Sequence, residues 1–279
     1  MRLRIAALAT SALMLAAPAA ARGTGDPDVA ALQVGLASHH LYTDVVDGYA
    51  GPHTLAGLNR LPGATTLFAP ATRAALGDYG AYALGSRPLV RGSFGWDVAA
   101  LQFTLAWHGF PSGRFDGSFG PRTKAALLRF QRWAGIDPIG IAGPRTLAAL
   151  RLPPEACPVS LSLPIDAPAT DGFGPRGSGF HTGIDYPAPI GTPVTAARDG
   201  VVEAAGWLPG YGRVVVLRHE QGVTTFYAHL SRILVDVGRP LTRGTALGLV
   251  GQTGDATGPH LHFEVRVRGA AVDPAPAFG

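Results

Sequence analysis

The chain has 279 residues, of which 47% are hydrophobic and 15% are charged. These proportions are typical of a globular protein and exclude an intrinsically disordered chain. The formal net charge of +4 is not gathered into Lys/Arg runs, so it suits an anionic surface and excludes nucleic acid as a partner. The 38 glycines and 24 prolines favour many turns and short strands over long helices.

Residues 1–21 have the pattern of a secretory signal peptide. Arg2 and Arg4 precede an apolar run from Ile5 to Ala17, and small residues follow where a signal peptidase would cut. The run is too short to span a membrane comfortably. We therefore expect an exported protein, secreted or held in the cell wall or periplasm, with no stable membrane insertion.

An internal repeat follows the predicted signal peptide. The DVAALQ sequence of residues 28–33 returns at residues 97–102, which is 69 positions later. Asp47-Gly48 returns as Asp116-Gly117 at the same offset. Such a constant register predicts two copies of one module, over residues 26–80 and 95–152.

The second copy carries the clearer helix signals. We expect Asp97 to cap a first helix that ends near Gly109. Pro121 suits the first turn of a second helix that stops at Gly135, and a short third helix is expected over Pro144–Leu150. The sequence therefore predicts a small all-α module of three helices around one core.

This second copy resembles the peptidoglycan-binding domain of bacterial wall enzymes. The resemblance is carried by residues 97–102, 115–123, 130–131 and 143–147. It implies a module that binds peptidoglycan. In the first copy Leu61-Pro62 replaces the Phe-Gln pair of residues 130–131, so we expect a degenerate module that keeps the fold while its binding function is in question.

Residues 77–94 and 153–160 are rich in Gly, Pro and small residues and are expected to be linkers. Cys157, the only cysteine, lies in the second of these and cannot form an internal disulfide. The pattern changes to strands over residues 161–279, for which we expect a mostly antiparallel β domain. The strand candidates are residues 214–217, 223–227, 247–250 and 263–267.

His260 and His262 stand two residues apart in one of these strands. Side chains along a strand alternate between faces, so the two imidazoles share a face. The spacing predicts a metal site or an acid–base site, with a pair of surface histidines as the alternative.

Two further stretches supply candidate chemistry. His181 and Asp185 lie four residues apart in a segment whose glycine and proline argue against a helix, and both side chains are good Zn²⁺ ligands. His229 ends a strand whose outward-facing set is expected to include Thr225 and Tyr227. Arg176 and Asp199 could orient loops or ligands, although surface charge is the favoured interpretation of each.

Together these stretches resemble the lysostaphin-type, or LytM-like, zinc endopeptidases that cut peptide bonds in peptidoglycan. The resemblance covers residues 171–278 and is carried by residues 181–185, 191–194, 210–212, 227–230, 251–254 and 257–264. It implies that His181, Asp185 and His262 bind one Zn²⁺ per chain. It also implies that His229 and His260 are the catalytic pair, with His260 our first choice for the base and His229 for stabilising the oxyanion.

We therefore expect a multidomain chain, with all-α peptidoglycan-binding-like modules followed by an all-β metallopeptidase domain. The expected function is that of an exported zinc endopeptidase, monomeric, with peptidoglycan as substrate and binding target. The first alternative is a non-catalytic peptidoglycan-binding or amidase-activating protein on the same scaffold. The second is another metal-dependent hydrolase, such as a D,D-carboxypeptidase.

Overall fold

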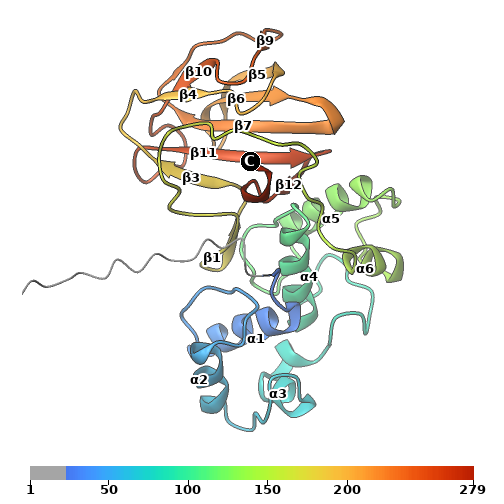
Figure 1. The fold of residues 1–279 in the computed structure, drawn as a ribbon. Helices are drawn as coiled ribbons and strands as arrows, with labels where there is room; N and C mark the ends of the chain where they lie inside the picture. The colour runs from blue at the N-terminus through green and yellow to red at the C-terminus, as the bar shows by residue number, and fades with distance from the viewer. Residues whose placement is uncertain (1–22) are drawn as a thin grey trace, which may run out of the picture.

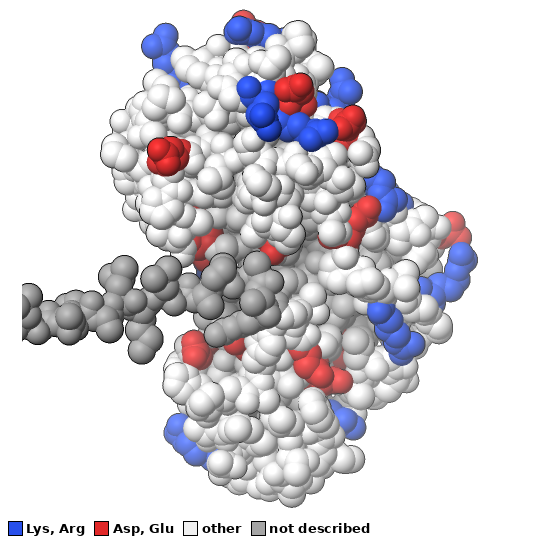
Figure 2. Space-filling view, viewed as in Figure 1, with Lys and Arg blue, Asp and Glu red and all other residues white. Residues whose placement is uncertain are grey.

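The computed structural model describes residues 23–279, so the predicted signal peptide lies outside the described residues. A helical part, in the lower half of Figure 1, is followed along the chain by an antiparallel β part in the upper half. Figure 2 shows the two parts as adjoining lobes whose visible face carries few charged side chains. Among residues 23–279 no helix is long and apolar enough to cross a membrane.

Each repeat copy forms three α-helices, as the sequence predicts for the second copy. The first copy contains α1 (Pro27–Ser38), α2 (Pro52–Arg60) and α3 (Pro70–Ala75), followed by the 3-10 helix η2 (Gly77–Gly80). The second contains α4 (Trp96–Trp107), α5 (Pro121–Trp133) and α6 (Pro144–Leu150). The prediction that Asp97 caps the first of these is wrong, because α4 begins one residue earlier and Asp97 is buried against Arg87, 2.7 Å away.

A buried glutamine explains why the first copy keeps its fold. Gln33 donates through Nε2 to Asp47 Oδ1 at 2.8 Å and to Thr54 Oγ1 at 3.0 Å. Gln102 makes the equivalent two bonds at 2.9 and 3.1 Å, 69 positions later. Each glutamine thereby ties its helix to the following turn and to the start of the next helix.

In the first copy, the second half of the repeat lacks a glutamine that makes such hydrogen bonds. Gln131, at the end of α5, donates to Thr146 Oγ1 on α6 at 3.1 Å. Pro62 occupies the equivalent position, and α2 already ends at Arg60. Thr72, on the short helix α3, bonds instead to nearby backbone at Thr66 O, 2.6 Å away.

One face of α4 packs into the core of the first copy, while its other face packs with α5 and α6 in a second core. Leu32 and Leu36 of α1 pack in the same buried cluster as Phe103 of α4, and Trp96 Nε1 donates to Asp28 Oδ1 at 2.6 Å. The expected linkers are also partly buried. Leu89 is fully buried and pairs with Ala142, while Val159 belongs to the core of the β part, against which Cys157 packs.

The β part is antiparallel throughout its named strand pairs, which confirms the predicted fold class. One sheet has the order β12-β11-β7-β6-β5-β9, with β3 also paired to β11; a smaller sheet has the order β4-β10-β8, and β1 pairs with β2. Buried side chains such as Tyr227, Leu247 and Phe263 form the core. The strands are β1 (Gly174–Arg176), β2 (Gly179–His181), β3 (Ile184–Pro187), β4 (Pro193–Thr195), β5 (Gly200–Leu208), β6 (Gly212–Arg218), β7 (Val223–Leu230), β8 (Arg232–Ile233), β9 (Pro240–Leu241), β10 (Ala246–Leu249), β11 (His260–Val267) and β12 (Ala270–Val272).

The β1–β2 hairpin joins the two parts of the molecule, reaching from the β part towards the helices in Figure 1. Phe115 N donates to Ser178 O in the hairpin turn at 2.6 Å. Trp107 of α4 packs edge-on against Phe173 and Phe180, with ring centroids 6.1 and 5.2 Å away. The helical part therefore holds a hairpin whose last residue is His181.

Candidate metal centre

A tight turn between two strands brings His181 and Asp185 together. His181 is the last residue of β2, Asp185 lies in β3, and Thr182-Gly183 form the turn between them. A Cβ on Gly183 would lie 2.3 Å from the Phe263 carbonyl oxygen, so only glycine lets the turn pack against β11. The four-residue spacing of His181 and Asp185 therefore spans a strand–turn–strand unit and not a helical turn.

His262 completes the group from the neighbouring strand. It lies directly opposite Asp185 in the register of β3 and β11, and its Nδ1 is 2.8 Å from Asp185 Oδ1. His181 Nε2 is 3.1 Å from Asp185 Oδ1 and 3.0 Å from His262 Nδ1. Among residues 23–279 this is the one group of three or more His, Cys, Asp or Glu side chains placed to hold a metal ion.

The partners of the two histidines decide which ring nitrogens are lone-pair donors. His181 Nδ1 lies 2.8 Å from the Gly172 carbonyl oxygen, and His262 Nε2 lies 3.0 Å from Glu264 Oε1. Because both partners only accept, these nitrogens carry the protons. His181 Nε2 and His262 Nδ1 therefore direct lone pairs towards the carboxylate of Asp185, which is the donor set that Zn²⁺ prefers.

The charges in the centre favour a cation. Burial alone would raise the pKa of Asp185, but the two imidazoles outweigh it when they are protonated on the nitrogens that face the carboxylate, and the pKa then lies far below its usual range. Burial would likewise raise the pKa of Glu264, yet the bond to His262 and the charge of Arg266 lower it to about 2. Two ionised carboxylates therefore flank the paired imidazoles.

Arg176 holds the other oxygen of Asp185. Its Nη1 lies 3.1 Å from Asp185 Oδ2 and 2.7 Å from Asp171 Oδ2. Of the two roles considered from the sequence, orientation of a ligand fits this contact better than surface charge does. Asp199 is exposed and accepts a bond from Arg243 N at 2.7 Å, so it orients a loop away from the centre.

His229 and His260 lie together beside the metal group. Their ring centroids are 4.7 Å apart, and His229 is 5.7 Å from the ring of His262. His229 Nδ1 bonds to the Thr253 carbonyl oxygen at 2.7 Å, and His260 Nδ1 bonds to that of Gly258 at 2.8 Å. Each ring therefore keeps Nε2 as an acceptor, as a general base requires.

The expected outward set of β7 is wrong for two of its three members. Thr225 and Tyr227 are fully buried on the core face, where the Tyr227 hydroxyl accepts from Thr225 Oγ1 at 3.0 Å and from Ala197 N at 2.9 Å. His229 reaches the opposite face because its φ is 60°, a left-handed conformation that breaks the alternation of the strand. Gly251 makes room for this bend, since a Cβ there would lie 2.7 Å from the His229 carbonyl oxygen.

Sequence reasoning assigned no role to two residues that support the centre, Tyr211 and Glu264. Tyr211 donates to Glu264 Oε1 at 2.9 Å and accepts from Arg266 Nη2 at 2.7 Å. Thr182 also bonds to Glu264. The period of two along β11, which places His262, Glu264 and Arg266 on one face, is the signal that could have found this network.

Two parts of the chain match known families. Residues 179–274 match peptidase family M23, and residues 95–150 match the family described as "Putative peptidoglycan binding domain". These matches confirm both resemblances drawn from the sequence. Family M23 consists of zinc metallopeptidases, so the match also confirms the expected enzyme class and cofactor.

Curated relatives match about a third of the chain. DD-carboxypeptidase/endopeptidase Mpg of Neisseria meningitidis serogroup B is 52% identical over 95 residues, which are 34% of this chain and 22% of that protein. Peptidoglycan DD-endopeptidase ShyA of Vibrio cholerae serotype O1 is 48% identical over 93 residues, 33% of this chain and 22% of that protein. The chain thus spans about a fifth of the length of these relatives.

A solved structure also resembles the chain. The crystal structure of a zinc containing peptidase from Vibrio cholerae is 38% identical, with a TM-score of 0.39. The similarity covers 41% of this chain and 39% of that one.

Proposed function

We propose that this chain, a member of peptidase family M23 through residues 179–274, is an exported zinc endopeptidase that hydrolyses peptide cross-links in bacterial peptidoglycan. The observation that carries the proposal is the convergence of His181, Asp185 and His262 with two further histidines in one groove. The match of residues 95–150 to a peptidoglycan binding domain supports the wall as substrate and binding target. The names of the curated relatives favour a D,D cross-link as the bond that is cut.

His181 Nε2, Asp185 Oδ1 and His262 Nδ1 would hold the ion. Bound zinc supplies Lewis-acid chemistry, which polarises a carbonyl and makes water more acidic. Arg176 and Glu264 keep the ligands in position by hydrogen bonds to Asp185 and His262. Three protein ligands would leave room for water or substrate at the ion, as in catalytic zinc sites.

His260 and His229 supply the proton chemistry in this proposal. Both present an unprotonated Nε2 towards the groove, so either can take a proton from attacking water and return it to the leaving amine. His260 Nε2 is 3.7 Å from Asp185 Oδ1, which places it beside the ligands. We therefore assign His260 as the base. His229, once its Nε2 is protonated, would stabilise the charge on the scissile carbonyl oxygen.

A D,D-carboxypeptidase is the second candidate, because the name of the Neisseria relative includes that activity. Digestion of purified sacculi by the full-length protein, followed by mass spectrometry of the muropeptides, tests both candidates. Conversion of cross-linked dimers to monomers supports the endopeptidase, whereas loss of one terminal D-alanine from uncross-linked stems supports the carboxypeptidase. An unchanged muropeptide profile with zinc bound would favour the non-catalytic scaffold.

A further inference from the structure

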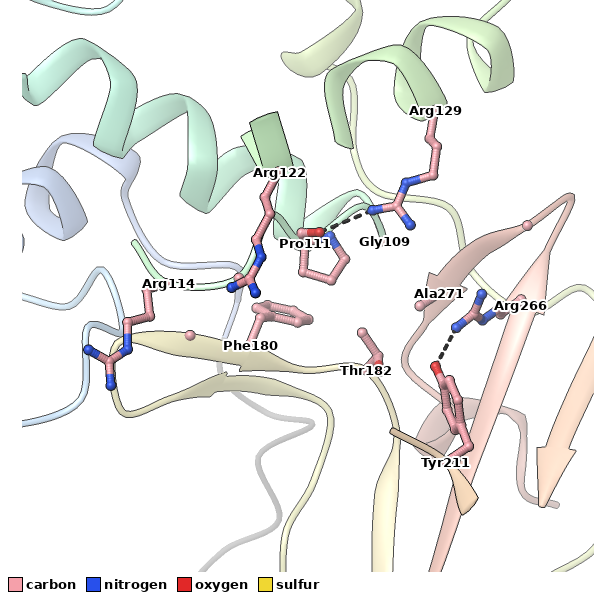
Figure 3. Close-up of a pocket in the computed structure, with 13 residues that line it drawn as sticks. Gly109, Pro111, Arg114, Arg122, Arg129, Phe180, Thr182, Tyr211, Arg266 and Ala271 are labelled. Atoms are coloured by element: carbon pink, nitrogen blue, oxygen red, sulfur yellow. Dashed lines mark hydrogen bonds between the residues drawn. The ribbon is translucent and has the colours of Figure 1, made fainter. Parts of the chain in front are cut away.

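A pocket lined by arginines lies where the second helical copy meets the β part (Figure 3). Arg122 and Arg129 extend into it from α5, Arg114 lies in the loop before α5, and Arg266 comes from β11. The described residues that line this arginine pocket include no aspartate or glutamate. The pocket is therefore cationic, and neither part of the chain could build it alone.

The arginines of the helical part lack a compensating charge. Arg266 forms an ion pair with Glu264 at 2.7 Å. Arg129 donates to the neutral Pro111 carbonyl at 3.1 Å, as the dashed line in Figure 3 shows. Within residues 23–279, Arg114, Arg122 and Arg129 form no ion pair with a carboxylate.

Arg129 of α5 and Arg266 of β11 lie on opposite sides of the junction, near enough for their charges to interact (Figure 3). Arg129 is exposed as a residue, yet burial of its guanidinium and, second, the charge of Arg266 lower its pKa. An anion placed between them would offset the repulsion between the two positive charges. The planar fork of arginine matches the two oxygens of a carboxylate, so a carboxylate is the anion that this arrangement suits.

The arginine pocket adjoins the groove of the metal centre. Phe180, Thr182 and Tyr211 line both of them. Tyr211 OH and Thr182 Oγ1 both bond to Glu264, which in turn holds His262. An extended peptide bound at the metal centre would therefore pass over this shared wall to reach the arginines.

The charges that line the two sites differ. Asp185, Asp255 and Glu264 line the metal groove together with Arg176, and this groove would also hold the ion, whereas every described charged residue that lines the neighbouring pocket is an arginine. A peptidoglycan stem peptide has the matching pattern, because it presents a neutral scissile amide and carries free carboxylates a few bonds away. An anionic group of the substrate would be attracted by the arginines of the pocket, which lack a compensating carboxylate in its lining.

We propose that the arginine pocket binds a free carboxylate of the stem peptide whose cross-link lies at the metal centre. This inference rests on the proposed function and deepens it, since it names the feature of the substrate that is recognised. The helical copy would then supply part of the substrate site in addition to tethering the enzyme to the wall.

The test compares the full-length wild type with the double variant Arg122→Gln/Arg129→Gln. The probes are synthetic cross-linked stem peptides whose non-scissile carboxylates are either free or amidated. We expect the wild type to bind the free form about tenfold more tightly and to cut it with about tenfold higher kcat/KM, which is the scale of a solvent-accessible charged hydrogen bond. In the double variant both ratios should fall to about one.

Arg145→Gln is the matched control, because Arg145 is an exposed arginine on α6 that does not line the pocket. It should keep the wild-type ratios, and all variants should keep the zinc content and thermal unfolding of the wild type. Peptides amidated at one position at a time then identify which carboxylate is recognised.

Binding is measured by calorimetry and needs no cleavage, so the two proposals can fail separately. Equal affinity of the wild type for free and amidated peptides would overturn the pocket assignment, as would a preference that survives in the double variant. Carboxylate-dependent binding without cleavage of any peptide would overturn the endopeptidase and retain the pocket. Cleavage without any preference for free carboxylates would overturn the pocket assignment and retain the endopeptidase.

Discussion

Asp185 and His262 face each other across the pairing of β3 with β11, and their Oδ1 and Nδ1 atoms are 2.8 Å apart. A slip of one residue between these strands would turn one of the two side chains to the other face. The register therefore brings together residues 77 positions apart in the chain. It also places Glu264, two residues along the same face, against the remaining nitrogen of His262.

The first prediction concerns the ligand set. His262→Ala should abolish zinc binding and peptidoglycan cleavage together, because it removes one of three ligands and leaves Asp185 without its closest partner. Metal content is measured by mass spectrometry on the full-length protein after dialysis. We expect about one zinc per wild-type chain, since a single three-ligand group is present among residues 23–279.

The matched control for that variant is His39→Ala, because His39 is exposed after α1 and has no contact with the centre. It should retain zinc and activity. Full zinc occupancy in His262→Ala would show that the ligand assignment is wrong.

The second prediction separates the catalytic pair from the ligands. His260→Ala and His229→Ala should both keep zinc, while kcat/KM falls by roughly two to four orders of magnitude, the usual effect of removing an acid–base group. The larger loss identifies the base, which we expect to be His260. Loss of zinc in either variant, with zinc retained in His262→Ala, would reverse the roles within the His-Leu-His pair.

The third prediction uses the backbone of His229. Its φ of 60° is unfavourable for a residue with a Cβ and is tolerated by glycine. His229→Gly should therefore be more stable to urea than His229→Ala by about 1 kcal/mol, although both lose activity. Equal stability of the two variants would mean that the left-handed conformation is not retained in solution.

Much of the β part could be predicted from the sequence. The strand alternation and the glycine-interrupted His181–Asp185 segment identify a strand scaffold, and all five candidate residues lie in one groove. The conformation of His229 could not be predicted, because a histidine gives no sign of a positive φ. Gly251 makes the space for this conformation, and it lies 22 residues away in the sequence. Its importance to His229 is therefore visible only in the folded chain.

The packing of the helical part against the β part could not be predicted from the sequence either. The Gly- and Pro-rich stretches over residues 77–94 and 153–160 indicate linkers between separate modules. Contacts such as Trp107 against Phe180 are long-range and follow no periodicity, so sequence patterns do not reveal them. The shared core of α1 and α4 was missed for the same reason.

The fourth prediction follows from these contacts. Trp107→Ala should lower kcat/KM on a small soluble peptide by about tenfold, because the β1–β2 hairpin loses its support and carries His181 out of position. Zinc should also dissociate faster, as measured with a chromogenic chelator. Trp133→Ala is the control, since Trp133 stacks on Phe130 away from the hairpin. Unchanged kinetics in Trp107→Ala would show that the helical part does not support the centre.

The last prediction concerns pH and a histidine remote from the metal. His219 is 6% exposed, with Nδ1 2.8 Å from the Asp199 carbonyl oxygen and Nε2 2.8 Å from Thr225 Oγ1. Burial lowers its pKa, and the nearby Arg198 adds to this, while the bond to Asp199 and the charge of Glu220 oppose it.

Because the pKa of His219 is lower in the folded chain than in the unfolded one, the unfolded state binds more protons below pH ~6.5. Its contribution to stability is therefore complete above that pH and is lost as the pH falls through the folded pKa. Between pH 7.5 and 5.5, the free energy of unfolding in urea should fall more steeply in the wild type than in His219→Gln, at equal zinc concentration. Any effect of pH on the metal centre is common to both proteins and cancels in this comparison, and His39→Gln should behave as the wild type. Parallel pH profiles for the wild type and His219→Gln would show that His219 is not held neutral by burial.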